Sequence, residues 1–215
     1  MKGFIQLIRN DHHQFDKGEL TDHFGNSPFE MISSWLREAM ERQVHEPNAM
    51  MISTIGLDGF PKTRVVYLKE LLEEGLVFYT NYSSDKGRAI EANPKLHALI
   101  FWPELERQIS ISALAEKVPA EMSDAYFASR PRGSQLGAWA SLQSEELDSR
   151  ETLEKRIEEF DTRFPNEVPR PPHWGGYLLK PVQVEFWQGR PSRLHDRICF
   201  ALNDDNTWRI FRKHP

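Results

Sequence analysis

The chain has one cysteine, Cys199, among its 215 residues. No intrachain disulfide is possible, so a fold of this length has to be stabilised by its own core. Low cysteine use fits a reducing compartment, and we expect a cytoplasmic protein. Long apolar runs are also missing, since no stretch approaches the roughly 18 residues that a membrane-spanning helix needs. The apolar run after Met1 is too short for the core of a signal peptide, so we expect no membrane partner.

An excess of positive charge is missing too. The net charge is −5, which disfavours binding to nucleic acid. Any anion site must therefore be built locally by a few basic residues. Apolar residues make up 39% of the chain and charged residues 27%, and these ordinary globular values argue against disorder.

Several chemical motifs are absent as well. The sequence has no GxGxxG following a strand, no P-loop and no GxSxG, which removes the usual markers of dinucleotide binding, nucleoside triphosphate binding and serine hydrolysis. None of the eight histidines shows i, i+4 spacing or a paired cysteine. We expect no metal site.

What the chain does have is a series of short β-like segments. Strands are expected at 49–55, 63–69, 76–80, 96–102, 108–115, 177–187, 193–202 and 208–212. Helices are expected at 28–40 with Ser27 as N-cap, at 84–93, at 119–129, and at 145–160 with Ser144 as N-cap. The polar residues 1–26 are expected to form an arm or lid, and 27–215 one domain. Strands in hairpin succession predict a mainly β fold, an antiparallel barrel with peripheral helices.

The most unusual segment is basic. Arg193, His195 and Arg197 alternate at period two, so on a strand all three would point to one face. Cationic side chains in a row repel one another, which favours a bound anion on that face. The competing interpretation is a solvated edge strand protected by basic residues.

A second group lies near the end of a predicted helix. Tyr126 and Arg130 are four residues apart and share a face, and Ser134 follows shortly after. Two hydroxyls and a guanidinium could cradle an oxyanion. The alternative is ordinary packing, with the polar groups satisfying loop carbonyls.

Two further basic pairs are candidates for anion binding. Arg64 and Lys69 are five residues apart, so on a regular strand they face opposite sides and would serve two different anions, unless the strand bulges. They could equally be two solvated strand ends. Ser84 and Lys86 begin a short helix, where backbone N–H groups favour phosphate, although Asp85 opposes this.

Together, the order and spacing of these segments resemble the pyridoxamine 5′-phosphate oxidase family, also called the pyridoxine/pyridoxamine 5′-phosphate oxidase family. The resemblance runs from about Ser27 to the C-terminus. The segments that carry it are Arg64–Lys69, Val77–Asn81, Leu105–Gln108, Tyr126–Gln135, Gly137–Trp139, Phe186–Gly189 and Arg193–Arg197.

The resemblance implies an FMN-binding split barrel that works as a homodimer, with FMN at the subunit interface and residues 173–215 contributing strands to the dimer and the active site. It implies oxidation of pyridoxamine or pyridoxine 5′-phosphate to pyridoxal 5′-phosphate, with O2 as acceptor and hydrogen peroxide as product. The alternatives are a split-barrel FMN reductase with another substrate, or a non-catalytic carrier of pyridoxal 5′-phosphate.

The resemblance also implies roles for individual residues. The cofactor residues would be Arg64, Val65, Val66, Tyr67, Leu68, Lys69, Tyr79, Thr80, Lys86, Gln108, Gln143, Ser144, Trp187 and Arg197. The substrate residues would be Lys69, Tyr126, Arg130, Ser134, Arg193 and His195, with Arg193 and His195 catalytic. Asp85 stands where the family commonly has a basic residue. In the arm, His12 and Phe15 stand where the family typically has an arginine and a tyrosine.

Overall fold

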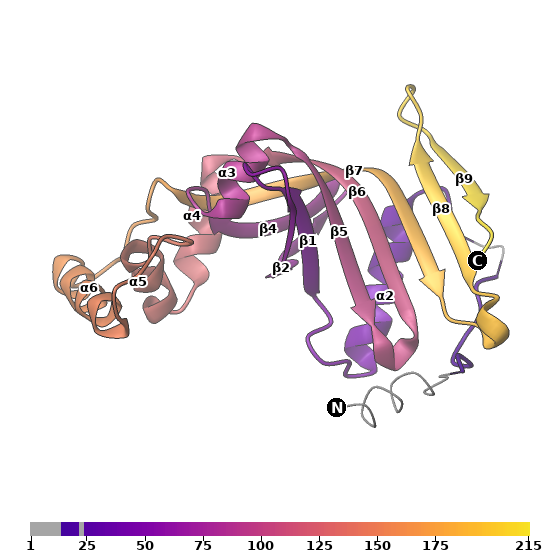
Figure 1. Ribbon diagram of the computed structural model, residues 1–215, viewed down its shortest axis with the longest axis horizontal. Helices are drawn as coiled ribbons and strands as arrows, with labels where there is room; N and C mark the ends of the chain where they lie inside the picture. Colours follow the sequence, from indigo (N-terminus) through magenta and orange to yellow (C-terminus); the bar gives the residue numbers. More distant parts are fainter. Residues whose placement is uncertain (1–13, 22–23) are drawn as a thin grey trace. The chain divides into compact units, whose positions relative to one another are not determined.

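The computed structural model describes residues 14–21 and 24–215, and its strands form one antiparallel sheet (Figure 1). Hydrogen bonds link the strands in the order β2-β1-β5-β6-β7-β4-β3, while β8 pairs with β7 and β9. The strands are β1 (Ala49–Ile55), β2 (Pro61–Tyr67), β3 (Glu70–Leu72), β4 (Gly75–Asn81), β5 (Lys95–Trp102), β6 (Arg107–Lys117), β7 (Trp174–Gln188), β8 (Asp196–Leu202) and β9 (Trp208–Arg212). The helices are α2 (Pro28–Glu41), α3 (Asp85–Ala92), α4 (Ala120–Ser129), α5 (Arg132–Ala140) and α6 (Arg150–Arg163), with 3-10 turns η1 (Pro103–Leu105) and η2 (Pro191–Arg193).

The chain packs as two compact units. The first contains the described residues up to Pro47 together with Phe101–Ser110 and Val184–Pro215. The second contains Asn48–Ile100 and Ile111–Gln183. Within the described residues, no helix is both long enough and apolar enough to cross a membrane.

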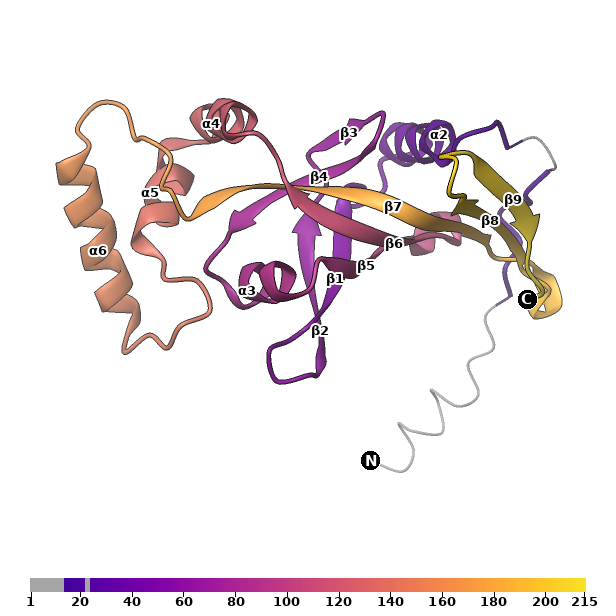
Figure 2. The ribbon, with the colours of Figure 1, turned by 90° about the horizontal axis from the view of Figure 1, so that it is seen from above.

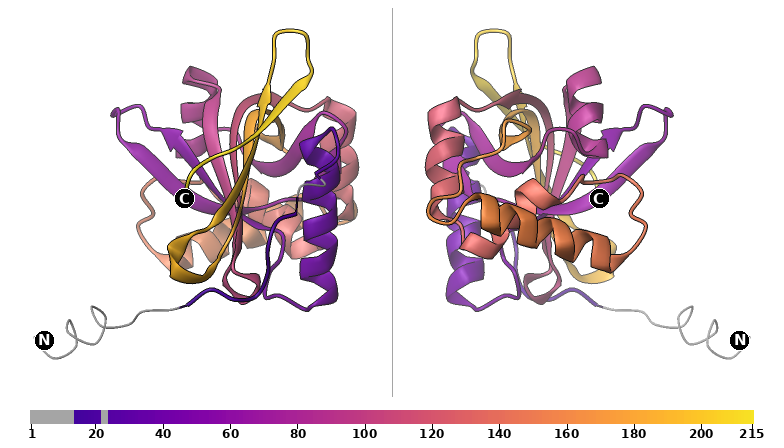
Figure 3. Two further views of the ribbon diagram at one scale, coloured as in Figure 1. Left: turned by 90° about the vertical axis from the view of Figure 1, so that its right-hand side faces the viewer. Right: turned by 90° about the vertical axis from the view of Figure 1, so that its left-hand side faces the viewer.

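The first unit is built on α2 and the β8–β9 hairpin (yellow in Figures 2 and 3). As predicted, Ser27 caps α2, and its hydroxyl accepts a hydrogen bond from the Phe29 N–H at 3.3 Å. The apolar face of α2 is buried, and the Trp35 ring meets Phe186 of β7 edge to face at 5.2 Å. A turn at 203–206 joins β8 to β9, with the Asn203 N–H donating to the carbonyl of Thr207 at 2.8 Å.

The second unit contains the hairpins that carry most of the candidate residues. In the β1–β2 pair, Ile52 lies opposite Arg64, so the register places that arginine midway along the hairpin. The start of α3 packs tightly on the chain before it, because a Cβ on Gly87 would lie 2.0 Å from the carbonyl oxygen of Tyr82. Only glycine fits this approach, and it fixes where α3 begins.

The structure corrects two of the predicted elements. The helix expected at 145–160 is α6, which begins at Arg150 and is capped by Ser149 through a 3.1 Å bond from the Thr152 N–H. Ser144, the expected cap, has a φ of 75° and precedes no helix. The strand expected from residue 193 begins at Asp196. Two elements, β3 and α5, were not predicted at all.

Candidate active site

The second unit contains a cavity of about 770 Å³, within the size range of cofactor and ligand sites. Thirteen of its lining residues were predicted from the sequence: Arg64, Val65, Val66, Tyr67, Lys69, Tyr79, Thr80, Lys86, Tyr126, Arg130, Ser134, Gln143 and Ser144. Asn81, Asp85 and Trp174 complete the lining. Four of these side chains are cationic and one is a carboxylate, so the cavity is locally positive in an acidic chain.

Arg64 and Lys86 form the first cationic pair. The Arg64 guanidinium donates to the Thr54 hydroxyl at 2.8 Å and to the Ile52 carbonyl at 3.3 Å. The Lys86 side chain is only 8% exposed, although it carries an amine. Burial, reinforced by the charge of Arg64, lowers the pKa of Lys86 to about 8. Both cations would gain from a dianionic partner.

The partners of Lys86 are all neutral oxygens. Its Nζ lies 3.1 Å from the Thr80 hydroxyl, 3.2 Å from the Ser84 hydroxyl and 3.3 Å from the Gln143 amide oxygen. Ser84 also caps α3, by accepting from the Gly87 N–H at 3.3 Å. The buried ammonium therefore lies at the start of a helix, where backbone N–H groups favour an anion.

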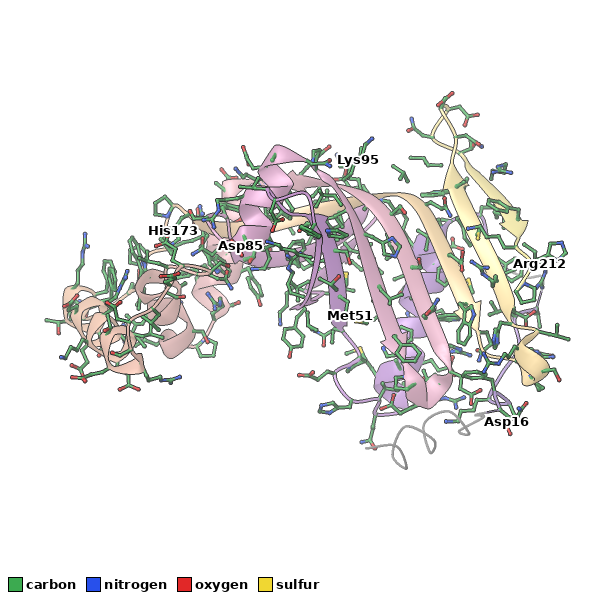
Figure 4. The ribbon with its side chains drawn as sticks, in the orientation of Figure 1. Asp16, Met51, Asp85, Lys95, His173 and Arg212 are labelled. Carbon is green, nitrogen blue, oxygen red and sulfur yellow. The ribbon has the colours of Figure 1, made fainter. Side chains whose placement is uncertain are left out.

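Asp85 is the one carboxylate in the lining (labelled in Figure 4). Its carboxylate pairs with Arg88, with 2.8 Å between Oδ1 and Nη2. Its backbone N–H donates to the hydroxyl of Ser144 at 3.2 Å, which brings the 141–149 loop against α3. Because its charge is balanced by Arg88, Asp85 opposes an anion less than the sequence suggested.

The second cationic group surrounds Arg130 at the end of α4. The Tyr79 and Tyr126 rings stack with centroids 3.9 Å apart, and the Trp174 ring lies nearly parallel to both. The Arg130 guanidinium lies 4.6 Å from the centroid of Trp174. Its Nη1 is buried and has no hydrogen-bond partner among the described residues. An orphaned charged donor beside a cavity indicates a site for an anion.

Lys69 lines the same cavity as Arg64, although their spacing predicted opposite faces. The reason is that β2 ends at Tyr67, so strand alternation does not extend to Lys69. The Lys69 ammonium lies 5.3 Å from the centroid of the Tyr67 ring. Leu68, predicted to line the flavin, is buried and is not part of the cavity lining.

The remaining predicted residues, Gln108, Trp187, Arg193, His195 and Arg197, belong to the first unit. The strand interpretation of this segment is wrong, because Arg193 ends η2 and β8 begins only at Asp196. Ser192 and Arg193 have φ values of 57° and 60°. Period-two alternation therefore does not apply, and Arg193 is presented from a turn.

His195 is held by its neighbours in that turn. Its Nδ1 accepts a hydrogen bond from the Arg190 N–H at 3.1 Å, and its ring lies 4.6 Å from that of Trp187. Burial, and then the charge of Arg193, lower the pKa of His195, which favours the neutral ring. A nitrogen that accepts a hydrogen bond carries no proton, which leaves Nε2–H as the donor of this ring.

Arg197 is fixed by a bidentate contact with a carboxylate. Its Nε and Nη2 donate to the two oxygens of Glu185 at 2.8 and 2.9 Å, and its Nη1 donates to the His214 carbonyl at 3.0 Å. Lys213 reaches the same carboxylate at 3.0 Å. Burial opposes ionisation of Glu185, but hydrogen bonds from Lys213 and Arg197 outweigh it and lower the pKa of the carboxyl.

Sequence reasoning missed Asn81 and Trp174. Asn81 ends β4 directly after Thr80, and its position within a predicted motif was an available signal. Trp174 follows a proline-rich connector, and no local pattern indicated that it would stack against Tyr79 and Arg130. Across the described ranges, no group of three or more His, Cys, Asp or Glu could hold a metal ion.

An antiparallel sheet with a cation-lined cavity is an arrangement suited to a protein that binds phosphorylated ligands. Residues 36–164 match the family described as pyridoxamine 5′-phosphate oxidase, and residues 174–215 match the pyridoxine 5′-phosphate oxidase C-terminal dimerisation region. The chain belongs to the pyridoxine/pyridoxamine 5′-phosphate oxidase family.

Individual relatives agree with this membership. Pyridoxine/pyridoxamine 5′-phosphate oxidases from Cupriavidus metallidurans and Chromobacterium violaceum are 52% and 55% identical over 87% and 84% of this chain, and over 89% and 85% of their own lengths. The oxidase from Flavobacterium johnsoniae is 49% identical over 95% of this chain and 97% of its own.

Two solved structures show the fold. PhzG from Burkholderia lata, in complex with tetrahydrophenazine-1-carboxylic acid, has a TM-score of 0.86 and 29% identity, covering 93% of this chain and all of its own. A pyridoxamine 5′-phosphate oxidase-related, FMN-binding protein from Nostoc punctiforme has a TM-score of 0.71 and 18% identity, covering 88% and 98%. These matches confirm the predicted split-barrel class.

Proposed function

We propose that this protein is an FMN-dependent oxidase that converts pyridoxine 5′-phosphate and pyridoxamine 5′-phosphate to pyridoxal 5′-phosphate. The alcohol is oxidised by O2 with release of hydrogen peroxide, and the amine also consumes water and releases ammonia. The observation that carries the proposal is the cavity itself, which holds two separate groups of cations, one around the buried Lys86 and one around Arg130 with its buried Nη1. Among the described residues, neither group shows an ion pair to a carboxylate. Two phosphorylated ligands, a cofactor and a substrate, account for both groups.

The residues present fit FMN. Its phosphate would be held by Arg64 and by Lys86. Within the described part of the chain, the buried Lys86 ammonium has only neutral oxygens as hydrogen-bond partners. The run 65–67, with Tyr79 and Thr80, would line the flavin. When bound, FMN accepts a hydride from C4′ of the substrate and passes the electrons to O2.

The substrate phosphate would be held by Lys69, Tyr126, Arg130 and Ser134. Because the phosphate is remote from the reacting carbon, binding the phosphate orients the pyridine ring and so positions that carbon. His195 would donate from Nε2 at the reacting end, because its Nδ1 is occupied by the Arg190 N–H. Arg193 would cover the substrate, and Gln108, Gln143, Ser144, Trp187 and Arg197 would complete the flavin site.

We place the working enzyme in the cytoplasm as a homodimer, with FMN at the interface and some of these residues supplied by the partner subunit. The match of 174–215 to a dimerisation region supports the dimer. The chain is about 50% identical to pyridoxine/pyridoxamine 5′-phosphate oxidases and 29% identical to PhzG. This difference favours the substrates of those oxidases over that of PhzG.

The colour of the purified protein provides the first test. A yellow protein with one FMN per chain is expected, and pyridoxine or pyridoxamine 5′-phosphate added without oxygen should bleach it, with colour returning on exposure to air. A flavin-loaded protein that neither compound bleaches would contradict the proposal and favour a reductase with another substrate. A colourless protein that binds pyridoxal 5′-phosphate would favour the carrier.

Changing Arg130 to alanine is expected to raise KM for both substrates by roughly 10–150-fold, the equivalent of about 1.5–3 kcal/mol of lost charge-assisted bonding. The buried Nη1, which has no hydrogen-bond partner among the described residues, supports this guanidinium as a phosphate donor. Steady-state peroxide assays measure the effect. Arg132→Ala is the matched control, because Arg132 pairs with Asp161 and does not line the cavity. Equal KM values for Arg130→Ala and the wild type would remove the phosphate cradle.

A further inference from the structure

Glu106 is a buried carboxylate between η1 and β6. It is 1% exposed and has a φ of 55°. One of its oxygens, Oε2, accepts hydrogen bonds from the backbone N–H groups of Asp16 at 2.8 Å and Lys17 at 3.0 Å. A buried charge is stabilised when N–H donors converge on it, and charge-assisted bonds of this kind are the strong ones. Two of the donors that satisfy Glu106 therefore come from the N-terminal arm (Asp16 is labelled in Figure 4).

Residues 14–21, a described part of the arm, make further contacts within the same unit. The Leu20 N–H donates to Asp196 Oδ2 at 3.1 Å, and Arg190 Nη1 donates to the Gly18 carbonyl at 3.1 Å. A Cβ on Gly18 would lie 2.9 Å from the side-chain oxygen of Gln188. Close packing and hydrogen bonds together give the arm one defined course.

Phe15 immediately precedes the two N–H groups that Glu106 binds. Its ring lies edge-on to Trp187 at 5.5 Å and to His195 at 5.2 Å. It also rests on Gly189, where a Cβ would come within 2.6 Å of the ring. The Phe15 ring therefore occupies a packing site formed by the backbone of Gly189 and by the side chains of Trp187 and His195.

The contact of Phe15 with His195 restricts the orientation of the imidazole ring. The Arg190 N–H fixes one end of the imidazole through Nδ1, and the Trp187 ring lies 4.6 Å away. These two contacts still allow the ring to tilt, and the edge of Phe15 restricts that movement. The arm thus contributes one of the three contacts that define where Nε2–H points.

We infer that Glu106 is a positioning residue, whose carboxylate latches the arm so that Phe15 holds His195 in its donating orientation. The inference rests on the proposed function, because His195 is placed at the substrate there. Glu106 is buried and is not among the lining residues of the cavity proposed for the ligands, so we expect it to act through the arm.

Hydrogen exchange at the Asp16 and Lys17 amides tests the latch directly. In Glu106→Ala, exchange at both amides is expected to be roughly tenfold faster or more, since both lose their acceptor. Glu106→Gln retains a carbonyl oxygen without the charge, so an intermediate rate is expected. Glu104→Ala is the matched control, because it removes a neighbouring exposed acid and leaves exchange unchanged. Unchanged protection in both Glu106 variants would overturn the latch.

The positioning role is tested by a double-mutant cycle on kcat/KM for pyridoxine 5′-phosphate. Glu106→Ala and Phe15→Ala are each expected to lower kcat/KM about tenfold. The double variant should lower kcat/KM hardly further, because both substitutions act through the same contact of Phe15 with His195. FMN affinity should stay within twofold. Additive losses, or unchanged kcat/KM despite faster exchange, would overturn the role. Should Glu106→Ala fail to fold, the Glu106→Gln cycle gives the same decision.

Failure of the proposed function would look different from failure of the latch. A wild-type protein that oxidises neither substrate refutes the proposed function. Exchange at the two amides would still decide whether Glu106 holds the arm.

Discussion

Arg193→Ala is expected to lower turnover by roughly 10²–10³-fold while FMN content stays near that of the wild type. Among the described residues, the Arg193 guanidinium donates no hydrogen bond, in contrast to Arg197, which is committed to Glu185. A cation with no protein partner is available to a substrate. Its removal is therefore expected to cost transition-state stabilisation and to leave the hydrogen bonds of the folded structure intact.

The backbone supports the same assignment. Ser192 and Arg193 both have positive φ, a conformation that costs a non-glycine residue about 1–2 kcal/mol. Strain of this kind persists where the surrounding structure requires it, and it occurs often at functional sites. We interpret it here as the means by which the turn presents Arg193.

Peroxide production and flavin absorbance of the same preparation measure the two quantities. Arg193→Lys is the control, since it keeps the charge but not the planar fork, and it should recover part of the lost turnover. An Arg193→Ala protein that loses its flavin, while its remaining holoenzyme turns over normally, would show that the residue serves the cofactor instead.

Local chemistry made much of this fold predictable. Ser27 and Ser84 cap the helices that their sequences indicate, and the turn at 203–206 joins the strands expected on either side. These features depend on residues close together in the chain, so they can be read from spacing alone.

One of the errors came from a contact between residues far apart in the chain. Ser144 and Ser149 both precede acidic helical sequence, and local signals do not distinguish them. In the structure the Ser144 hydroxyl accepts from the Asp85 N–H, 59 residues away, and Ser149 caps α6 instead. Likewise, no local pattern indicated that Arg193 lies in a turn, because its two positive-φ residues include no glycine. A tertiary contact decided the first case. The turn at Arg193 is held by local hydrogen bonds, from the Leu194 N–H to the Pro191 carbonyl and from the Arg190 N–H to His195 Nδ1.

Lys86→Met is expected to weaken FMN binding by roughly 10–150-fold, which corresponds to about 1.5–3 kcal/mol for a charge-assisted bond. The side chain is buried and contacts neutral oxygens of Thr80, Ser84 and Gln143, so a phosphate would be its charge partner. Methionine retains most of the volume and removes the charge. Titration of the apoprotein by quenching of flavin fluorescence measures the dissociation constant.

The pH dependence gives a sharper version of this test. In the apoprotein the pKa of Lys86 is about 8, below its ordinary value, because of burial and then Arg64. A phosphate monoester is largely dianionic above about pH 6. FMN should therefore bind most tightly between these two values, and its affinity should fall by up to about tenfold per unit as pH rises above 8 and the ammonium loses its proton.

Two variants separate Lys86 from other causes of that fall. Lys86→Met should show no loss of affinity tied to a group titrating near pH 8. Asp85→Asn should move the fall to lower pH, because the Asp85 carboxylate raises the pKa of Lys86 and its loss leaves burial and Arg64 less opposed. A wild-type affinity that stays constant from pH 7 to 10 would show that Lys86 does not bind the phosphate. The two variants should thus respond differently: one abolishes the fall in affinity and the other moves it to lower pH. Both expectations follow from the position of the buried Lys86 ammonium at the start of α3, where Arg64 lowers its pKa and Asp85 raises it.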